Sequence, residues 1–187
     1  MRILMLGNSF TFFHDMPSML AAILGSDVTA HTRGGAYLAE QYNPDTEMGA
    51  KTLAALKNER WDYVVLQEQS NAPVLKKSAY QKSIDILVPL IRASGAEPVI
   101  YASWAYREGS EKLASTGLSY EEMDRGMYES FHEAAERTHA LIADVGRAFT
   151  ELRELVPLYE ADDYHPSVSG SLLAAETIAA AIRAAQK

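Results

Sequence analysis

The chain contains no cysteine. This absence excludes disulfide bonds, zinc sites built on thiolates, and a cysteine nucleophile. The five histidines are scattered, and none of them forms an HxxxH or HExxH pair. Such pairs are the usual sequence sign of a catalytic metal site. We therefore expect no dedicated metal site and no cofactor.

Long hydrophobic runs and an excess of positive charge are also missing. No uninterrupted apolar run approaches the ~18 residues of a membrane-spanning helix. Only four strongly apolar residues separate Arg2 from Gly7, which is too short for the core of a secretion signal. We therefore expect a cytoplasmic protein with no membrane partner. The formal net charge of −8 argues against nucleic acid as a partner, because phosphate backbones attract positively charged surfaces.

Five short apolar or β-branched segments alternate with longer amphipathic ones along the 187 residues. We predict strands at residues 3–6, 27–32, 62–66, 97–102 and 141–145. We predict helices at residues 15–24, 46–58, 76–93, 119–139, 147–155 and 167–185. This alternation is typical of an α/β fold whose parallel sheet has helices on both faces, and 2-1-3-4-5 is the simplest strand order. The length favours a single domain spanning residues 1–187.

Polar and glycine residues follow the first three predicted strands. Ser9 comes after the first, Gly34 and Gly35 come after the second, and the polar string at 67–71 comes after the third. In a parallel sheet these positions share one edge, which is where ligands bind in open α/β folds. The loop before the last helix adds Asp162 and His165 and could reach the same edge.

These residue types are the parts that acyl transfer requires: a nucleophile, a base, a carboxylate that orients the base, and donors for an oxyanion. At a spacing of three residues, Asp162 can accept from one imidazole nitrogen of His165 while the other nitrogen faces Ser9. Asp163 is the alternative carboxylate, although its spacing places it less well under the ring.

Each residue also has a purely structural explanation. Ser9 could cap a helix, Gly34 and Gly35 could form a simple turn, and His165 could close the entry to the last helix. A non-catalytic flavodoxin-like domain that binds an anion at residues 7–11 is the main alternative function. That alternative lacks a glycine-rich phosphate fingerprint and leaves the Asp–His pair unexplained.

The motifs together resemble the SGNH (GDSL-like) hydrolase family over nearly the whole chain. They are Gly-Asn-Ser-Phe-Thr at residues 7–11, the glycine turn, an Asn after the third strand, and Asp-Asp-Tyr-His-Pro at residues 162–166. The resemblance implies a flavodoxin-like three-layer α/β/α fold. It also implies hydrolysis of carboxylic esters, often acyl groups on sugars, so the expected partner is a small-molecule or glycan ester.

Position by position, the resemblance makes Ser9 the nucleophile and first oxyanion amide, His165 the base and Asp162 its orienting partner. It makes Gly35 the second amide donor, with Gly34 as the alternative, and Asn71 the side-chain donor.

The third motif departs from the family's Gly-x-Asn-Asp, since this chain has Gln69-Ser70-Asn71-Ala72. Gln67 or Gln69 could therefore supply the amide instead of Asn71. A degenerate family member that binds a sugar or a small anion without catalysis is a further alternative. The irregular segment 103–117 is long for a connection and could line a substrate site, or its aromatic rings could pack in the core.

Overall fold

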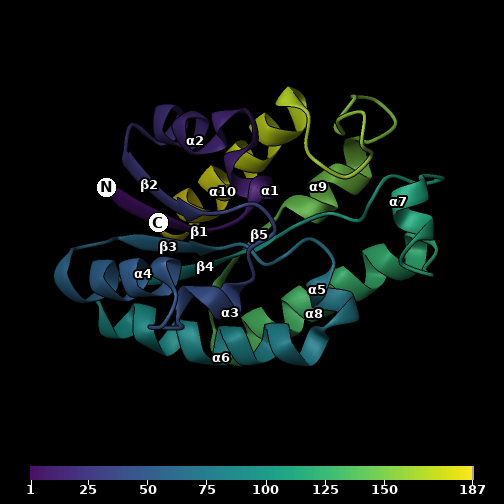
Figure 1. The fold of residues 1–187 in the computed structure, drawn as a ribbon. Helices are drawn as coiled ribbons and strands as arrows, with labels where there is room; N and C mark the ends of the chain where they lie inside the picture. The colour runs from purple at the N-terminus through teal and green to yellow at the C-terminus, as the bar shows by residue number, and fades with distance from the viewer. Residues whose placement is uncertain (187) are drawn as a thin grey trace.

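A single parallel sheet organises the protein (Figure 1). The structure, a computed structural model, describes residues 1–186. The strands are β1 (Arg2–Gly7), β2 (Asp27–Thr32), β3 (Tyr63–Leu66), β4 (Glu97–Ala102) and β5 (Leu141–Asp144). Their order is β2-β1-β3-β4-β5 and every neighbouring pair is parallel, which confirms the predicted fold class and strand order.

Helices cover both faces of this sheet and complete three layers (Figure 1). One face carries α2 (Met16–Leu24), α9 (Val145–Leu152) and α10 (Val168–Ala185). The other carries α4 (Glu47–Asn58), α6 (Lys77–Ala93) and α8 (Tyr120–Thr138). The short helices are α1 (Ser9–Phe12), the 3-10 turn η1 (Phe13–Asp15), α3 (Leu38–Gln41), α5 (Ala72–Leu75) and α7 (Glu111–Ala114).

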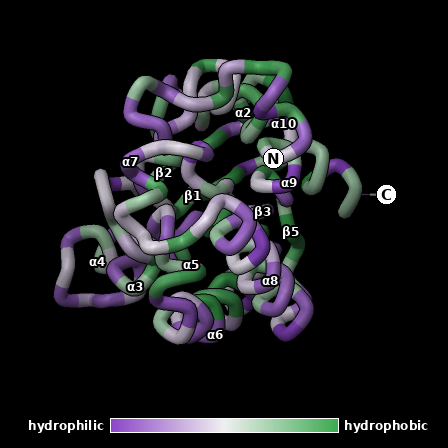
Figure 2. Tube along the Cα trace, turned by 90° about the vertical axis from the view of Figure 1, so that its right-hand side faces the viewer, coloured by the Kyte–Doolittle hydropathy of each residue, from purple (hydrophilic) through white to green (hydrophobic). Residues whose placement is uncertain are grey.

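The burial of the strands follows from this layering. Residues 3–6 of β1 are fully buried, as a continuous apolar run requires when helices lie on both sides. The edge strand β2 buries only His31, which explains its alternating sequence. Figure 2 shows hydrophobic residues along the central strands and hydrophilic ones over the outer turns of α8.

Helix α10 is the one described helix that is long and apolar enough to cross a membrane, with a mean hydropathy of 1.3 over 18 residues. Its Ala174, Ile178 and Ile182 are fully buried within the hydrophobic core. Core helices of other proteins can meet the same length and composition criteria, and 39% of this segment is buried inside the protein.

Several element ends differ from the sequence predictions by one to three residues, as hydrogen-bonded helix ends commonly do. The helix predicted at 147–155 lies at 145–152, because Asp144 caps it two residues earlier than expected. A capping box begins α8: Ser119 Oγ accepts from Glu122 N at 3.2 Å, and Ser119 N donates to the Glu122 carboxylate at 2.8 Å. The one-turn helices α1, α3, α5 and α7 have no period long enough to be visible in the sequence.

Candidate active site

The structure brings Ser9, His165 and Asp162 into one hydrogen-bonded chain. Ser9 is the first residue of α1, directly beyond the carboxyl end of β1, and its Oγ lies 2.8 Å from His165 Nε2. On the other side of the imidazole, Nδ1 lies 2.6 Å from Asp162 Oδ2. A carboxylate at Nδ1 fixes the tautomer that leaves Nε2 free to accept the serine proton.

Local contacts hold the imidazole in this position. The Phe13 ring is parallel to it at 4.1 Å between centroids, and the Tyr164 ring lies 4.1 Å away on a tilted plane. Asp162 Oδ1 accepts from the backbone N–H of His165 at 3.0 Å and of Tyr164 at 3.3 Å. Although partial burial acts against it, hydrogen bonds from the His165 ring and these amides lower the pKa of Asp162.

The neighbouring carboxylate, Asp163, has a different partner. Its Oδ1 lies 3.1 Å from an Arg107 guanidinium nitrogen, and its backbone adopts a left-handed φ of 65°. That conformation turns the chain so that Asp162 lies under the imidazole of His165. The choice of Asp162 over Asp163 therefore agrees with the geometry.

Ser9 is held by buried contacts around β1 and β3. The Gln67 carboxamide oxygen accepts from Asn8 N at 2.8 Å and from Thr11 Oγ1 at 3.0 Å. A Cβ at Gly7 would lie 2.4 Å from that Thr11 oxygen and 2.6 Å from the Gln67 oxygen, so only glycine leaves room for this network. The Gln67 nitrogen donates to the Glu68 carbonyl, which leaves Gln67 fully engaged inside the protein.

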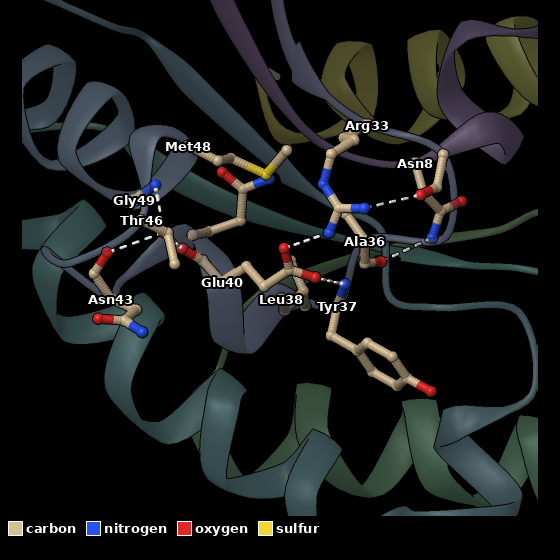
Figure 3. A network of polar contacts seen from close by, with 12 residues as sticks. Asn8, Arg33, Ala36, Tyr37, Leu38, Glu40, Asn43, Thr46, Met48 and Gly49 are labelled. Carbon is tan, nitrogen blue, oxygen red and sulfur yellow. Dashed lines mark hydrogen bonds and ion pairs between the residues drawn. The ribbon is translucent and has the colours of Figure 1, made fainter.

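The glycine turn after β2 is tied to the same loop (Figure 3). Ala36 N donates to Arg33 O at 3.1 Å across the turn, and Gly35 has a φ of 68° that favours glycine. The Asn8 side chain donates to Ala36 O at 3.0 Å, as Figure 3 shows. Ser9 and the turn that contains Gly35 are therefore fixed relative to one another.

A cleft of about 400 Å³ opens above these groups. It is lined by Asn8, Ser9, Phe12, Phe13, Gly34, Gly35, Gln69, Ser70, Lys112, Tyr164 and His165. Gln69 belongs to this lining, whereas Asn71 does not and instead begins α5. Of the three amides considered from the sequence, Gln69 is thus the one beside Ser9 in the cleft.

Comparison with known proteins gives one strong match and several distant ones. A solved structure of a protein from Slackia heliotrinireducens assigned to the SGNH hydrolases is 48% identical, covers 97% of this chain and 98% of its own, and has a TM-score of 0.94. The chain belongs to the SGNH hydrolase family. No protein-family model and no curated protein matches it.

Two further structures resemble this SGNH hydrolase in fold. A GDSL-like lipase structure from Parabacteroides merdae is 15% identical, with a TM-score of 0.74 and coverage of 96% of this chain and 94% of its own. Axe2, an acetyl-xylooligosaccharide esterase from Geobacillus, is 19% identical, with a TM-score of 0.70 and coverage of 97% and 93%. At these identities the likeness shows the shared fold.

Two features of this SGNH hydrolase were not expected from the sequence. Glu68 is buried, and its Oε1 accepts from Gln69 N at 2.6 Å and from Leu38 N at 3.1 Å. Burial, opposed by these backbone hydrogen bonds, raises the pKa of Glu68 to about 7. The only signal in the sequence is that a carboxylate lies two residues beyond an apolar strand, and such carboxylates are usually solvated.

The second feature is Lys112, which reaches the cleft from α7 within the irregular segment 103–117. The aromatic residues of this segment, Trp104 and Tyr106, are buried and do not line the cleft. Trp104 is buried between Phe10 and Phe149, with ring centroids 4.5 and 3.9 Å away, and belongs to the core. The later part of the segment contributes to the cleft wall.

Proposed function

We propose that this SGNH hydrolase cleaves carboxylic esters, with acetyl or other short acyl groups, through an acyl-enzyme on Ser9. The observation that carries the proposal is the chain of contacts from Ser9 Oγ to His165 Nε2 at 2.8 Å and from His165 Nδ1 to Asp162 Oδ2 at 2.6 Å. The resemblance to an acetyl-xylooligosaccharide esterase supports acylated carbohydrates as the substrate class.

In the first half of the reaction, His165 Nε2 accepts the proton of Ser9 as Oγ attacks the ester carbonyl carbon. The ionised Asp162 stabilises the imidazolium that forms. The tetrahedral oxyanion is proposed to bind the backbone N–H of Ser9, that of Gly35 (or Gly34) and the side-chain amide of Gln69. His165 then protonates the departing alcohol.

In the second half, a water molecule replaces the alcohol. His165 Nε2 takes a proton from this water as its oxygen attacks the acyl carbon, and the same donors bind the second oxyanion. The proton returns to Ser9 Oγ when the carboxylic acid leaves. The enzyme is regenerated with no change in its net protonation.

Hydrolysis of p-nitrophenyl acetate by purified wild type and Ser9→Ala tests the proposal. Loss of a triad member is expected to lower kcat by about 10⁴-fold. Equal rates for the two proteins would refute the role of Ser9.

A fluorophosphonate probe adds a covalent test, because the cleft contains a second serine. The described hydrogen bonds of Ser70 Oγ go to Tyr106 Oη at 2.6 Å and Gln69 Nε2 at 3.2 Å, so no base activates it. Mass spectrometry should locate the label on Ser9, and a label on Ser70 would contradict the assignment.

A further inference from the structure

Lys112 places a positive charge in the cleft that contains Ser9 and His165. The residue is half-buried on the one-turn helix α7, and its Nζ lies 4.4 Å from the centre of the Tyr164 ring. The same nitrogen is 5.7 Å from the centre of the Tyr106 ring. Because Tyr164 also contacts the His165 ring, a single aromatic ring separates the ammonium group from the proposed base.

No carboxylate in residues 1–186 forms an ion pair with Lys112. The two acids that directly precede Tyr164 in the sequence have other partners, since Asp162 pairs with His165 and Asp163 pairs with Arg107. The aromatic contacts hold the ammonium by cation–π attraction and leave its N–H groups available to a ligand.

The rest of the cleft lining contains no carboxylate. It consists of aromatic rings, glycines, hydroxyls and carboxamides. A cation in a partly desolvated cleft favours an anionic ligand, and charge-assisted hydrogen bonds are the stronger class of polar contact.

We propose that Lys112 selects esters that carry a negative charge, such as a carboxylate on the alcohol or on the acyl part. This inference rests on the proposed esterase function and names the substrate class of that site. Lys112 is then a residue that determines specificity, and it takes no part in proton transfer.

Matched ester pairs that differ only in one charge provide the test. For the alcohol side, the pair is 4-acetoxybenzoate and its methyl ester. For the acyl side, it is 4-nitrophenyl hydrogen glutarate and 4-nitrophenyl methyl glutarate. The ratio of kcat/KM for the anionic and neutral members is compared between wild type and variants, so intrinsic reactivity cancels.

Lys112→Met is expected to lower this ratio about 10-fold or more for at least one pair, because the anionic ester loses a charge-assisted contact that the neutral ester lacks. Lys112→Arg should retain most of the wild-type ratio. Lys82→Met removes the same charge from the exposed surface of α6 and should leave the ratio unchanged. A purely structural role of Lys112 predicts equal losses for anionic and neutral esters, and that result would overturn the proposal.

Binding of the product anion 4-hydroxybenzoate or glutarate, measured by calorimetry, separates this inference from the catalytic one. If Ser9→Ala hydrolyses neutral esters as fast as wild type, the proposed function fails, but anion binding can still be compared between wild type and Lys112→Met. Weaker binding of either anion by the variant supports the role of Lys112. Equal affinity, or no binding of either anion by wild type, overturns it.

Discussion

Burial of Glu68 should make stability depend on pH in a direction opposite to that of most carboxylates. The pKa of Glu68 is raised from 4.5 to about 7, chiefly by burial. Between these two pH values the folded protein holds a proton on Glu68 that the unfolded chain has released. The contribution of Glu68 to the free energy of unfolding is therefore largest at low pH, and it is lost as the pH rises towards 7.

The size of the effect follows from the same two pKa values. Between pH 5 and pH 8, a carboxyl with a pKa of 4.5 unfolded and about 7 folded lowers the free energy of unfolding by about 2–3 kcal/mol. Glu68→Gln removes this titration and keeps an oxygen that can accept from Leu38 N and Gln69 N. Of the nearby charges, Glu40 raises the pKa of Glu68 and Lys76 lowers it, and both remain in the variant.

Urea denaturation of wild type and Glu68→Gln at pH 5, 6, 7 and 8 measures the difference directly. The stability of the variant relative to wild type should grow by about 2–3 kcal/mol over this range, mostly below pH 7. Other titrating groups, including His31 with a pKa lowered to about 4 by burial, contribute to both proteins and cancel. Glu176→Gln, at an exposed position of α10, is the control and should give parallel curves. Parallel curves for Glu68→Gln would refute the reasoning, because they would mean that the two backbone hydrogen bonds compensate for burial.

Four further substitutions test the site and the fold. Gln69→Ala should lower kcat/KM for ester hydrolysis about 10²–10³-fold, as loss of one oxyanion donor does, while Asn71→Ala should change it little. A larger loss for Asn71→Ala than for Gln69→Ala would assign the oxyanion contact to Asn71. Gly49→Ala should destabilise the protein by about 3 kcal/mol or more in urea denaturation, because the new Cβ would lie 2.0 Å from a backbone carbonyl oxygen. An unfolding midpoint of the variant equal to that of wild type would contradict this packing. Gln67→Leu should cost about 1–3 kcal/mol in the same assay, since the buried N–H of Asn8 loses its acceptor, and an unchanged stability would show that another group satisfies it.

The sheet could be predicted from the sequence because its signals are local. Strands β2 and β4 lie at the residues predicted, 27–32 and 97–102, and the strand order follows from the handedness of the crossovers. The apolar run at 3–6 also predicts a strand buried on both faces, as β1 is.

The segment from Ser9 to Asp15 could not be predicted, because distant contacts shape it. His14 and Asp15 have left-handed φ values of 51° and 54°, which local propensity disfavours. His14 Nε2 lies 2.8 Å from a Glu160 carboxylate oxygen, and Ser171 Oγ donates to the Phe13 carbonyl at 3.2 Å. Both partners lie about 150 residues further along the chain, where a sequence window does not reach.

The candidate active site shows the same contrast between features that local sequence signals predict and features that depend on distant contacts. The geometry of Ser9, His165 and Asp162 agrees with the sequence prediction, because strand ends and a three-residue spacing constrain where these side chains lie. The choice among the amides at 67–71 depends on how an irregular loop directs successive side chains. The sequence could therefore narrow the proposed side-chain oxyanion donor to the segment 67–71, and the cleft lining favours Gln69 within it.

Two residues directly before the altered third motif have separate structural roles. Gln67 binds the backbone of the loop that carries Ser9, while Glu68 binds the backbone of Leu38 beyond the glycine turn. The Glu68 carbonyl also accepts from the Asn8 side chain at 3.4 Å. One segment thus sets the distance between the two loops whose amides are proposed to bind the oxyanion. Substitutions at Gln67 should consequently lower kcat more than they raise KM, because they displace donors that act mainly in the transition state.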